Sequence, residues 1–252
     1  MPDTLAQALA MPGLGWLSVT IAIAGLVRGF TGFGTALIVV PVAGIFLAPH
    51  EVIVVIALTG IASTFVLLPR AFRQADSADV SVLILAALVM APLGFWLMAR
   101  LDDVLVRWCV AIVAGGTLLA LVTGWRYAGR VTRNKLVPVG GAAGIIGGMT
   151  GLTGPAVILF YLTGQATAQT IRANTILFLA GLDVVLLANL FFRDLVTGAL
   201  IFYAALLAVP YFITSLIGQA LFHPDYERSY RALAYSVIAL AVVTGLPVWE
   251  PA

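Results

Sequence analysis

The stretch GLVRGFTGFGTALIVVP at residues 25–41 indicates the fold, because it sets four glycines and an arginine inside an apolar region. That region, residues 14–47, would extend about 50 Å as one straight helix, whereas the hydrocarbon core of a bilayer is about 30 Å thick. Glycine accepts backbone angles that other residues avoid. The region is therefore predicted to be a broken helix or a hairpin of half-helices.

The same pattern returns 119 residues later, where residues 144–153 read GIIGGMTGLT. Four positions are identical in the two copies: Gly25 and Gly144, Gly29 and Gly148, Thr31 and Thr150, Gly32 and Gly151. Internal repeats of this kind are frequent in secondary transporters. The chain is therefore predicted to be one transport domain with a first half at 1–125, a basic connection at 126–136 and a second half at 137–252.

The composition is that of a membrane protein. Hydrophobic residues make up 62% of the 252 residues and charged residues only 10%, and the mean hydropathy is +1.10. Soluble domains carry roughly a quarter charged residues, and a soluble fold could not hide this much apolar surface. The net charge of +2 gives no indication of nucleic-acid binding, and the single cysteine, Cys109, excludes an intrachain disulfide.

Clusters of charged residues separate about eight hydrophobic regions that lack the alternation of barrel strands, so an all-α polytopic fold is predicted. The regions are 14–47, 51–69, 80–99, 104–124, 136–163, 172–192, 196–221 and 232–249. Regions 14–47 and 136–163 are glycine-rich and too long for one straight span, so broken helices are expected in both.

The direction of insertion depends on how often the chain crosses. Eight single crossings would leave more Lys and Arg on the N-terminal side, and the positive-inside rule would then place the N-terminus in the cytoplasm. This count does not apply if the two long regions each cross twice. Four crossings per half would make the halves parallel and five would make them inverted, and the sequence leaves both open.

A helix that breaks at mid-membrane frees N–H groups at the start of a half-helix, which together with the helix dipole form an anion site. Thr31, Thr35, Thr150 and Thr153 would add hydroxyl donors, although threonine in a helix often bonds its own backbone. The glycines have the alternative role of close helix packing. The expected site residues are Arg28, Gly29, Thr31, Gly32, Phe33, Gly34, Gly148, Thr150, Gly151, Thr153, Gly154, Arg172 and Asn174.

Three ionisable residues fall inside the apolar regions. A charge at membrane depth costs about 2.5–3.5 kcal/mol even on insertion scales, so Arg28 and Arg172 need an anionic partner or an aqueous path. A bound oxyanion would suit the planar guanidinium, and the alternative for Arg172 is an interfacial position. Asp183 could carry a coupling proton, bind Na⁺ or form a structural ion pair.

The sequence lacks the residues that several other classes of function require. The two histidines have no ligand-spaced carboxylates or cysteines, so neither a metal site nor a cofactor is expected. No nucleotide-binding loop of the Walker type and no hydrolase triad is found, which disfavours ATP-driven transport and an enzyme. A structural, chaperone-like membrane subunit is the remaining alternative of another class.

The sequence resembles the TauE/SafE family, also called the sulfite exporter or toluene-sulfonate uptake permease family. The resemblance is carried by residues 25–41, by GAAGIIGGMTGLTGPAVILFYL at 141–162 and by TIRANTILFL at 170–179. It implies transport of small sulfur-containing anions such as sulfite, sulfonates and sulfoacetate. It also implies that the glycine turns fall at Gly29–Gly34 and Gly148–Gly154, with the arginine after the second turn at Arg172.

Together these observations predict a secondary transporter of small sulfur-containing or other organic anions, multi-pass in the cell inner (plasma) membrane. The anion would be held at the midplane by half-helix N-termini and arginine, and the halves would move for alternating access. Because Gly147 is the counterpart of Arg28, the site would be asymmetric. The expected partners are the anion, the lipid bilayer, and H⁺ or Na⁺ as coupling ion, with a homodimer left open. An uncoupled anion channel is the alternative.

Overall fold

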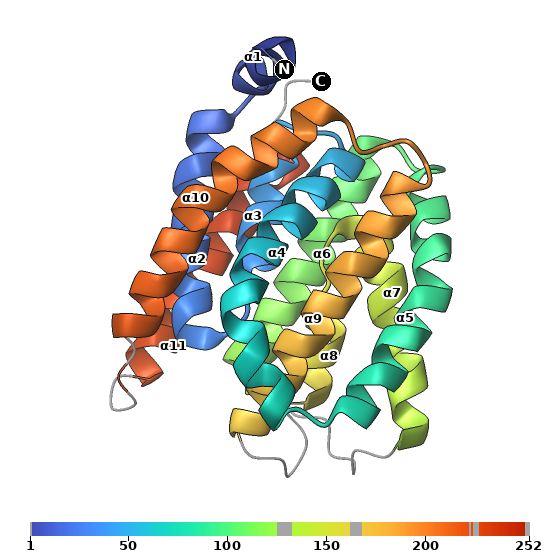
Figure 1. Cartoon of the computed structure of the whole chain (residues 1–252), viewed down its shortest axis with the longest axis vertical. Coiled ribbons are helices and arrows are strands. Elements are labelled where there is room, and N and C mark those ends of the chain that lie inside the picture. Colours follow the sequence, from blue (N-terminus) through green and yellow to red (C-terminus); the bar gives the residue numbers. More distant parts are fainter. Residues whose placement is uncertain (1, 125–132, 162–167, 222, 224–226, 250–252) are drawn as a thin grey trace.

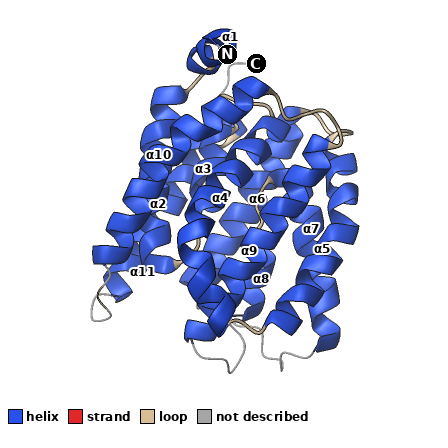
Figure 2. Ribbon diagram, viewed as in Figure 1, coloured by secondary structure: helices blue, strands red, loops and turns tan. Residues whose placement is uncertain are grey.

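The computed structural model describes residues 2–124, 133–161, 168–221, 223 and 227–249. Within these residues all regular elements are helical and none is a strand, as Figure 2 shows. The helices are α1 (Pro2–Ala10), α2 (Leu14–Thr31), α3 (Thr35–Ala43), α4 (Pro49–Gln74), α5 (Ser77–Met98), α6 (Asp103–Val122), α7 (Arg133–Thr150), α8 (Pro155–Tyr161), α9 (Ala168–Phe191), α10 (Gly198–Leu221) and α11 (Glu227–Thr244), followed by a 3₁₀ turn (Pro247–Trp249).

The predicted all-α polytopic class is confirmed. Five of the described helices are long and apolar enough to cross a membrane: α2, α5, α6, α9 from Gln169 onward, and α10. The predicted number of about eight spans is not confirmed, because α4 and α11 contribute only shorter apolar stretches, Pro49–Ile61 and Ser229–Thr244. The predicted basic connection at 126–136 lies mostly outside the described residues.

The first long apolar region is a helix hairpin. Helix α2 ends at Thr31, and the chain turns through Gly32 (φ 81°) and Gly34 (φ 100°), in the left-handed region that favours glycine. Helix α3 then returns toward the start of α2, because Phe46, just after α3, packs on Gly13. Both ends of the hairpin therefore lie at one end of the bundle, the upper end in Figure 1. We call this end, with residues 44–48, the α1 face.

The second long apolar region is a hairpin of the opposite direction. Helix α4 leaves the α1 face and α5 returns to it, as Figure 1 shows. Helix α7 runs parallel to α5, because Gly140 packs on Leu83 and Gly148 packs on Ala91. The chain turns at Gly151 (φ 77°), and the short helix α8 leads back. This hairpin therefore starts from the other end of the bundle, which we call the opposite face.

Glycines let each hairpin touch another helix backbone to backbone. A Cβ on Gly29 would lie 2.7 Å from the Cα of Gly218 in α10, and one on Gly144 would lie 2.5 Å from the carbonyl oxygen of Ala87 in α5. Such contacts are the small-residue packing of membrane helices. Gly29 and Gly148 thus lie inside helices, and the breaks begin two to three residues later than the glycine density suggested.

The hairpins also change the expected topology. The orientation count applies only to eight single crossings, whereas each long region returns toward the end of the bundle from which it starts. The count therefore does not apply, because the direction of the chain after each break is set by tertiary packing and not by the local pattern.

We expect Gly144→Ala to lower the stability of the bundle, because its Cβ would press on the Ala87 backbone, which cannot move aside. Overpacking of this kind costs about 1–3 kcal/mol. The matched control is Gly116→Ala in α6, whose Cβ would meet nothing within 4 Å. Thermal unfolding in detergent, followed by tryptophan fluorescence, should show a lower midpoint for Gly144→Ala alone. Equal midpoints would contradict the close approach of α5 and α7.

Candidate functional site

The two chain breaks meet at a small cavity in the centre of the bundle. Its volume is about 30 Å³, which holds about one or two waters. The first residues of α3 and of α8 both line it, together with side chains from four other helices. The lining residues are Arg28, Gly34, Thr35, Ala36, Leu37, Ile56, Gly60, Thr153, Gly154, Pro155, Ile158, Leu179, Asp183 and Tyr211.

Arg28 supplies the positive charge of this cavity from the last turn of α2. The residue is only 6% exposed, and within the described part of the chain its Nε and Nη2 atoms have no hydrogen-bond partner. Buried polar groups in proteins are almost always hydrogen-bonded, and leaving a charged donor unpaired costs several kcal/mol. A guanidinium in this state is suited to a ligand that accepts hydrogen bonds in its plane.

The start of α3 adds backbone donors beside Arg28. Its N-cap, Gly34, has no side chain to satisfy them, and the first α-helical hydrogen bond runs from the Ile38 N–H to the Gly34 carbonyl. The N–H groups of residues 35–37 therefore have no partner within the helix. The Thr35 hydroxyl is hydrogen-bonded to the Tyr211 hydroxyl at 2.8 Å, which ties α3 to α10 at the cavity wall.

The repeated threonines close the two turns in the same way. Thr31 Oγ1 donates to the Val27 carbonyl at 2.8 Å, and Thr150 Oγ1 donates to the Ile146 carbonyl at 2.7 Å. Each hydroxyl also accepts a backbone N–H two residues ahead, at 3.3 Å and 3.2 Å. Thr31 and Thr150 thus satisfy freed backbone groups of their own turns and do not line the central cavity.

Asp183 of α9 faces Arg28 across the cavity. It is 7% exposed, and its carboxylate interacts electrostatically with the Arg28 guanidinium. Gly60 of α4 makes room for it, because a Cβ there would lie 2.6 Å from Asp183 Oδ2. The cavity therefore contains one cationic and one anionic side chain, held by helices from both predicted halves.

Arg172 and Asn174, which were also predicted as site residues, lie outside the cavity lining. Arg172 is half-buried on Gly32, where a Cβ would lie 3.0 Å from its Nε atom, and its charge is close enough to Arg28 for the two to repel. Asn174 is buried and accepts a hydrogen bond from the Asp76 N–H at 2.8 Å, which fastens α9 to the α4–α5 turn.

Of the predicted residues, the structure brings six together around the cavity: Arg28, Gly34, Thr35, Thr153, Gly154 and Asp183. The other predicted residues are beside it: Gly29 and Gly148 pack helices, Thr31, Gly32, Phe33, Thr150 and Gly151 form the turns, and Arg172 and Asn174 lie toward the opposite face. Sequence reasoning did not single out Gly60 or Tyr211. A signal for Tyr211 is its place after Pro210, which matches Pro92 at an offset of 118.

The groups around the cavity are suited to binding a small anion. The cavity combines a guanidinium that has two nitrogens without hydrogen bonds with the first N–H groups of α3, and many of its walls are apolar, which strengthens charge interactions. Among the described residues no cluster of three His, Cys, Asp or Glu side chains could hold a metal ion. At about 30 Å³ the cavity is collapsed, so an oxyanion could enter only after the surrounding helices shift.

Two opposed hairpins that meet at a buried cavity are a feature that many secondary transporters share. The family described as sulfite exporter TauE/SafE matches residues 17–245, and the chain belongs to this family. Neither a curated protein nor a solved structure matches it. Membership implies a membrane transporter of sulfite or a related sulfur anion rather than an enzyme. The resemblance found in the sequence is thereby confirmed.

We expect Gly60→Ala to destabilise the protein only while Asp183 is present. Its Cβ would displace the carboxylate, whereas Asp183→Ala would leave room for it. A double-mutant cycle on the free energy of unfolding should give a coupling of about 1–3 kcal/mol, as for residues in direct contact. The control cycle pairs Asp183→Ala with Gly116→Ala and should be additive. A coupling near zero in both cycles would contradict the contact.

Proposed function

We propose that the chain is a secondary transporter of sulfite-, sulfonate- or sulfoacetate-type anions or of other small organic anions in the inner membrane. The observation that carries the proposal is the buried Arg28 guanidinium with unpaired Nε and Nη2 atoms at the start of α3. The donors match a planar or pyramidal oxyanion, which accepts several hydrogen bonds at once. In the transporting state the anion lies between Arg28 and the N–H groups of residues 35–37.

Thr153 and the Thr35–Tyr211 pair would complete the anion site. The Thr153 side chain is 4% exposed and lines the cavity from the second break, opposite α3. Both hydroxyls of the Thr35–Tyr211 pair can rotate to donate to an anion oxygen. The anion would thus touch both hairpins at once, as expected for a site between two moving parts.

Asp183 gives the site a means of coupling. An ionised carboxylate in the same apolar cavity repels an anion, and protonation or a bound Na⁺ removes this repulsion. Binding of the anion and of the cation would then support each other, which is the thermodynamic requirement for co-transport. Arg172, which repels Arg28 across Gly32, would attract the anion on its way between the site and the opposite face.

We also propose that the two halves, 1–125 and 137–252, are inverted repeats that move against each other. Helices α2 and α10 run in the same direction, and so do α5 and α7, as their packing glycines show. With the offset of the repeat, α2 corresponds to α7, and α10 corresponds to α5. Each hairpin thus packs on a helix of the other half, so a rocking motion would carry both breaks together.

The hairpins change the inferred orientation. Of the 13 Lys and Arg residues, Arg28 is central, three (Arg100, Arg107 and Arg193) belong to the α1 face, and the other nine belong in sequence to helix ends or connections at the opposite face. Under the positive-inside rule the opposite face is cytoplasmic and the α1 face is outside. This reverses the cytoplasmic N-terminus expected from eight single crossings.

We expect Arg28→Gln to weaken anion binding about thirty-fold or more, because losing one partner of a buried charged pair costs about 2–5 kcal/mol. The matched control is Arg100→Gln, since Arg100 lies at the α1 face over the Trp96 ring. Sulfite, sulfoacetate and simple carboxylates are tested by thermal stabilisation of the purified protein, and flux is measured in proteoliposomes. Unchanged binding and flux in Arg28→Gln would refute the site.

The same proteoliposomes separate a transporter from an uncoupled channel. A pH gradient without an anion gradient should drive uphill accumulation by the unaltered protein, and Asp183→Asn should abolish the accumulation. Anion conductance that only follows its own gradient would favour the channel.

We expect opposite labelling of two cysteines in intact cells. In a Cys109→Ser background, which has no other cysteine, Ala99→Cys marks the α1 face and Ser77→Cys marks the opposite face, and both positions are exposed. A membrane-impermeant maleimide should label Ala99→Cys directly and Ser77→Cys only after the membrane is permeabilised. The reverse pattern would overturn the orientation.

A further inference from the structure

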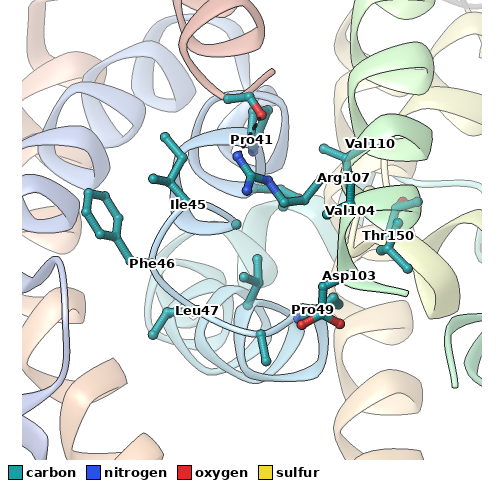
Figure 3. Close-up of a pocket in the computed structure, with 16 residues that line it drawn as sticks. Pro41, Ile45, Phe46, Leu47, Pro49, Asp103, Val104, Arg107, Val110 and Thr150 are labelled. Atoms are coloured by element: carbon teal, nitrogen blue, oxygen red, sulfur yellow. Dashed lines mark hydrogen bonds between the residues drawn. The ribbon is translucent and has the colours of Figure 1, made fainter. Parts of the chain in front are cut away.

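A second and larger cavity opens near the α1 face. Its volume is about 310 Å³, roughly ten times that of the central cavity. Its walls are the α3–α4 connection from Gly44 to Pro49, the first turns of α6, and the end of α11 at Gly245, as Figure 3 shows in part. We call this cavity the vestibule. Nothing in the proposed anion site uses it.

The vestibule reaches the second chain break from outside. Thr150, the last residue of α7, lines it and is only 3% exposed. Three residues further along, Thr153 lines the central cavity. The two cavities therefore lie on two sides of a single turn of the chain.

Side chains of α3 and α4 pack against the turn that separates the two cavities. A Cβ on Gly151 would lie 3.3 Å from Ile53 Cγ1 and 3.5 Å from Val40 Cγ2, and both side chains are buried. Val40 lines the vestibule, and Leu37, one helical turn earlier in α3, lines the central cavity. A small shift of α3 against the Gly151 turn would connect the two spaces.

Arg107 brings a positive charge into the vestibule. Figure 3 shows its guanidinium projecting into the cavity on the Pro41 side, while the Asp103 carboxylate lies toward Pro49. Asp103 is exposed, whereas Arg107 is half-buried and its Nη2 donates to the Gly245 carbonyl at 3.5 Å. Arg107 is therefore the more buried of the two charges, and water screens the exposed Asp103 carboxylate more strongly.

We propose that the vestibule is the α1-face entrance of the transport path and that Arg107 forms in it a second binding site for the transported oxyanion. The proposal rests on the proposed function and adds to it a second anion-binding site and a gate between the two sites. The gate is the contact of Val40 and Ile53 with the Gly151 turn. An anion at Arg107 lies outside this gate and passes it when α3 moves.

The test uses thiol labelling, which needs no transport. In a Cys109→Ser background we introduce Thr150→Cys, and Thr117→Cys serves as the matched control because it is equally buried at 3% but lines neither cavity. Purified protein is treated with a negatively charged sulfonatoethyl methanethiosulfonate or with its positively charged trimethylammonium analogue. Gly44→Cys, at the vestibule wall, is a second probe should Thr150→Cys fold poorly.

We expect the negative reagent to modify Thr150→Cys at least tenfold faster than Thr117→Cys, and sulfoacetate, which does not itself react with the reagent, to slow the reaction. Arg107→Gln should reduce the ratio of negative to positive labelling rates about tenfold, because a charge in a cleft raises the local concentration of counter-ions by 10- to 1,000-fold. Equal labelling rates at Thr150→Cys and Thr117→Cys would overturn the assignment of the vestibule as an entrance. A ratio of negative to positive labelling rates that does not depend on Arg107 would overturn the second binding site. Labelling as expected without anion flux would instead contradict the proposed function alone.

Discussion

A helix that ends inside hydrocarbon leaves backbone groups that neither lipid nor water can satisfy. Among the described residues, α2 and α7 end within the bundle at Thr31 and Thr150, and at each end a threonine hydroxyl donates to a carbonyl behind it and accepts from an N–H ahead of it. Each threonine thereby satisfies one freed N–H group of its own turn. The donors that stay free are those at the start of the returning helix, and they lie beside Arg28, where a ligand can use them.

The same constraint explains why the breaks are enclosed by other helices. Irregular backbone at membrane depth is tolerated only where protein surrounds it. The glycine faces of α2 and α7 let α10 and α5 approach closely enough to seal the outer side of each hairpin. On the inner side α4 and α9 close the cavity, and Gly60 lets the Asp183 carboxylate reach it. Small residues thus serve enclosure at several points, and at the breaks the positive φ values of Gly32, Gly34 and Gly151 are the ones that favour glycine.

The local pattern of the sequence predicted the helical membrane fold and the position of both breaks to within two or three residues. It did so because glycine density and apolar length are local properties. The direction of the chain after each break was not predictable, since it depends on contacts such as Phe46 with Gly13. For the same reason Asp183 and Arg28 were singled out separately, while Gly60 and Tyr211 were missed. Gly60 and Tyr211 contribute to the site only because tertiary packing places α4 and α10 against the hairpins.

Each hairpin packs on a helix of the other half, and this has a consequence for biosynthesis. The glycine face of α2 emerges from the ribosome early, but its partner α10 begins only at Gly198. During translation of the residues between them, α2 and its short returning helix lack the neighbour that seals them from lipid. The first half cannot reach its final packing before the second is inserted, so assembly of this protein is necessarily a late, whole-chain event, and a truncated product would expose the break.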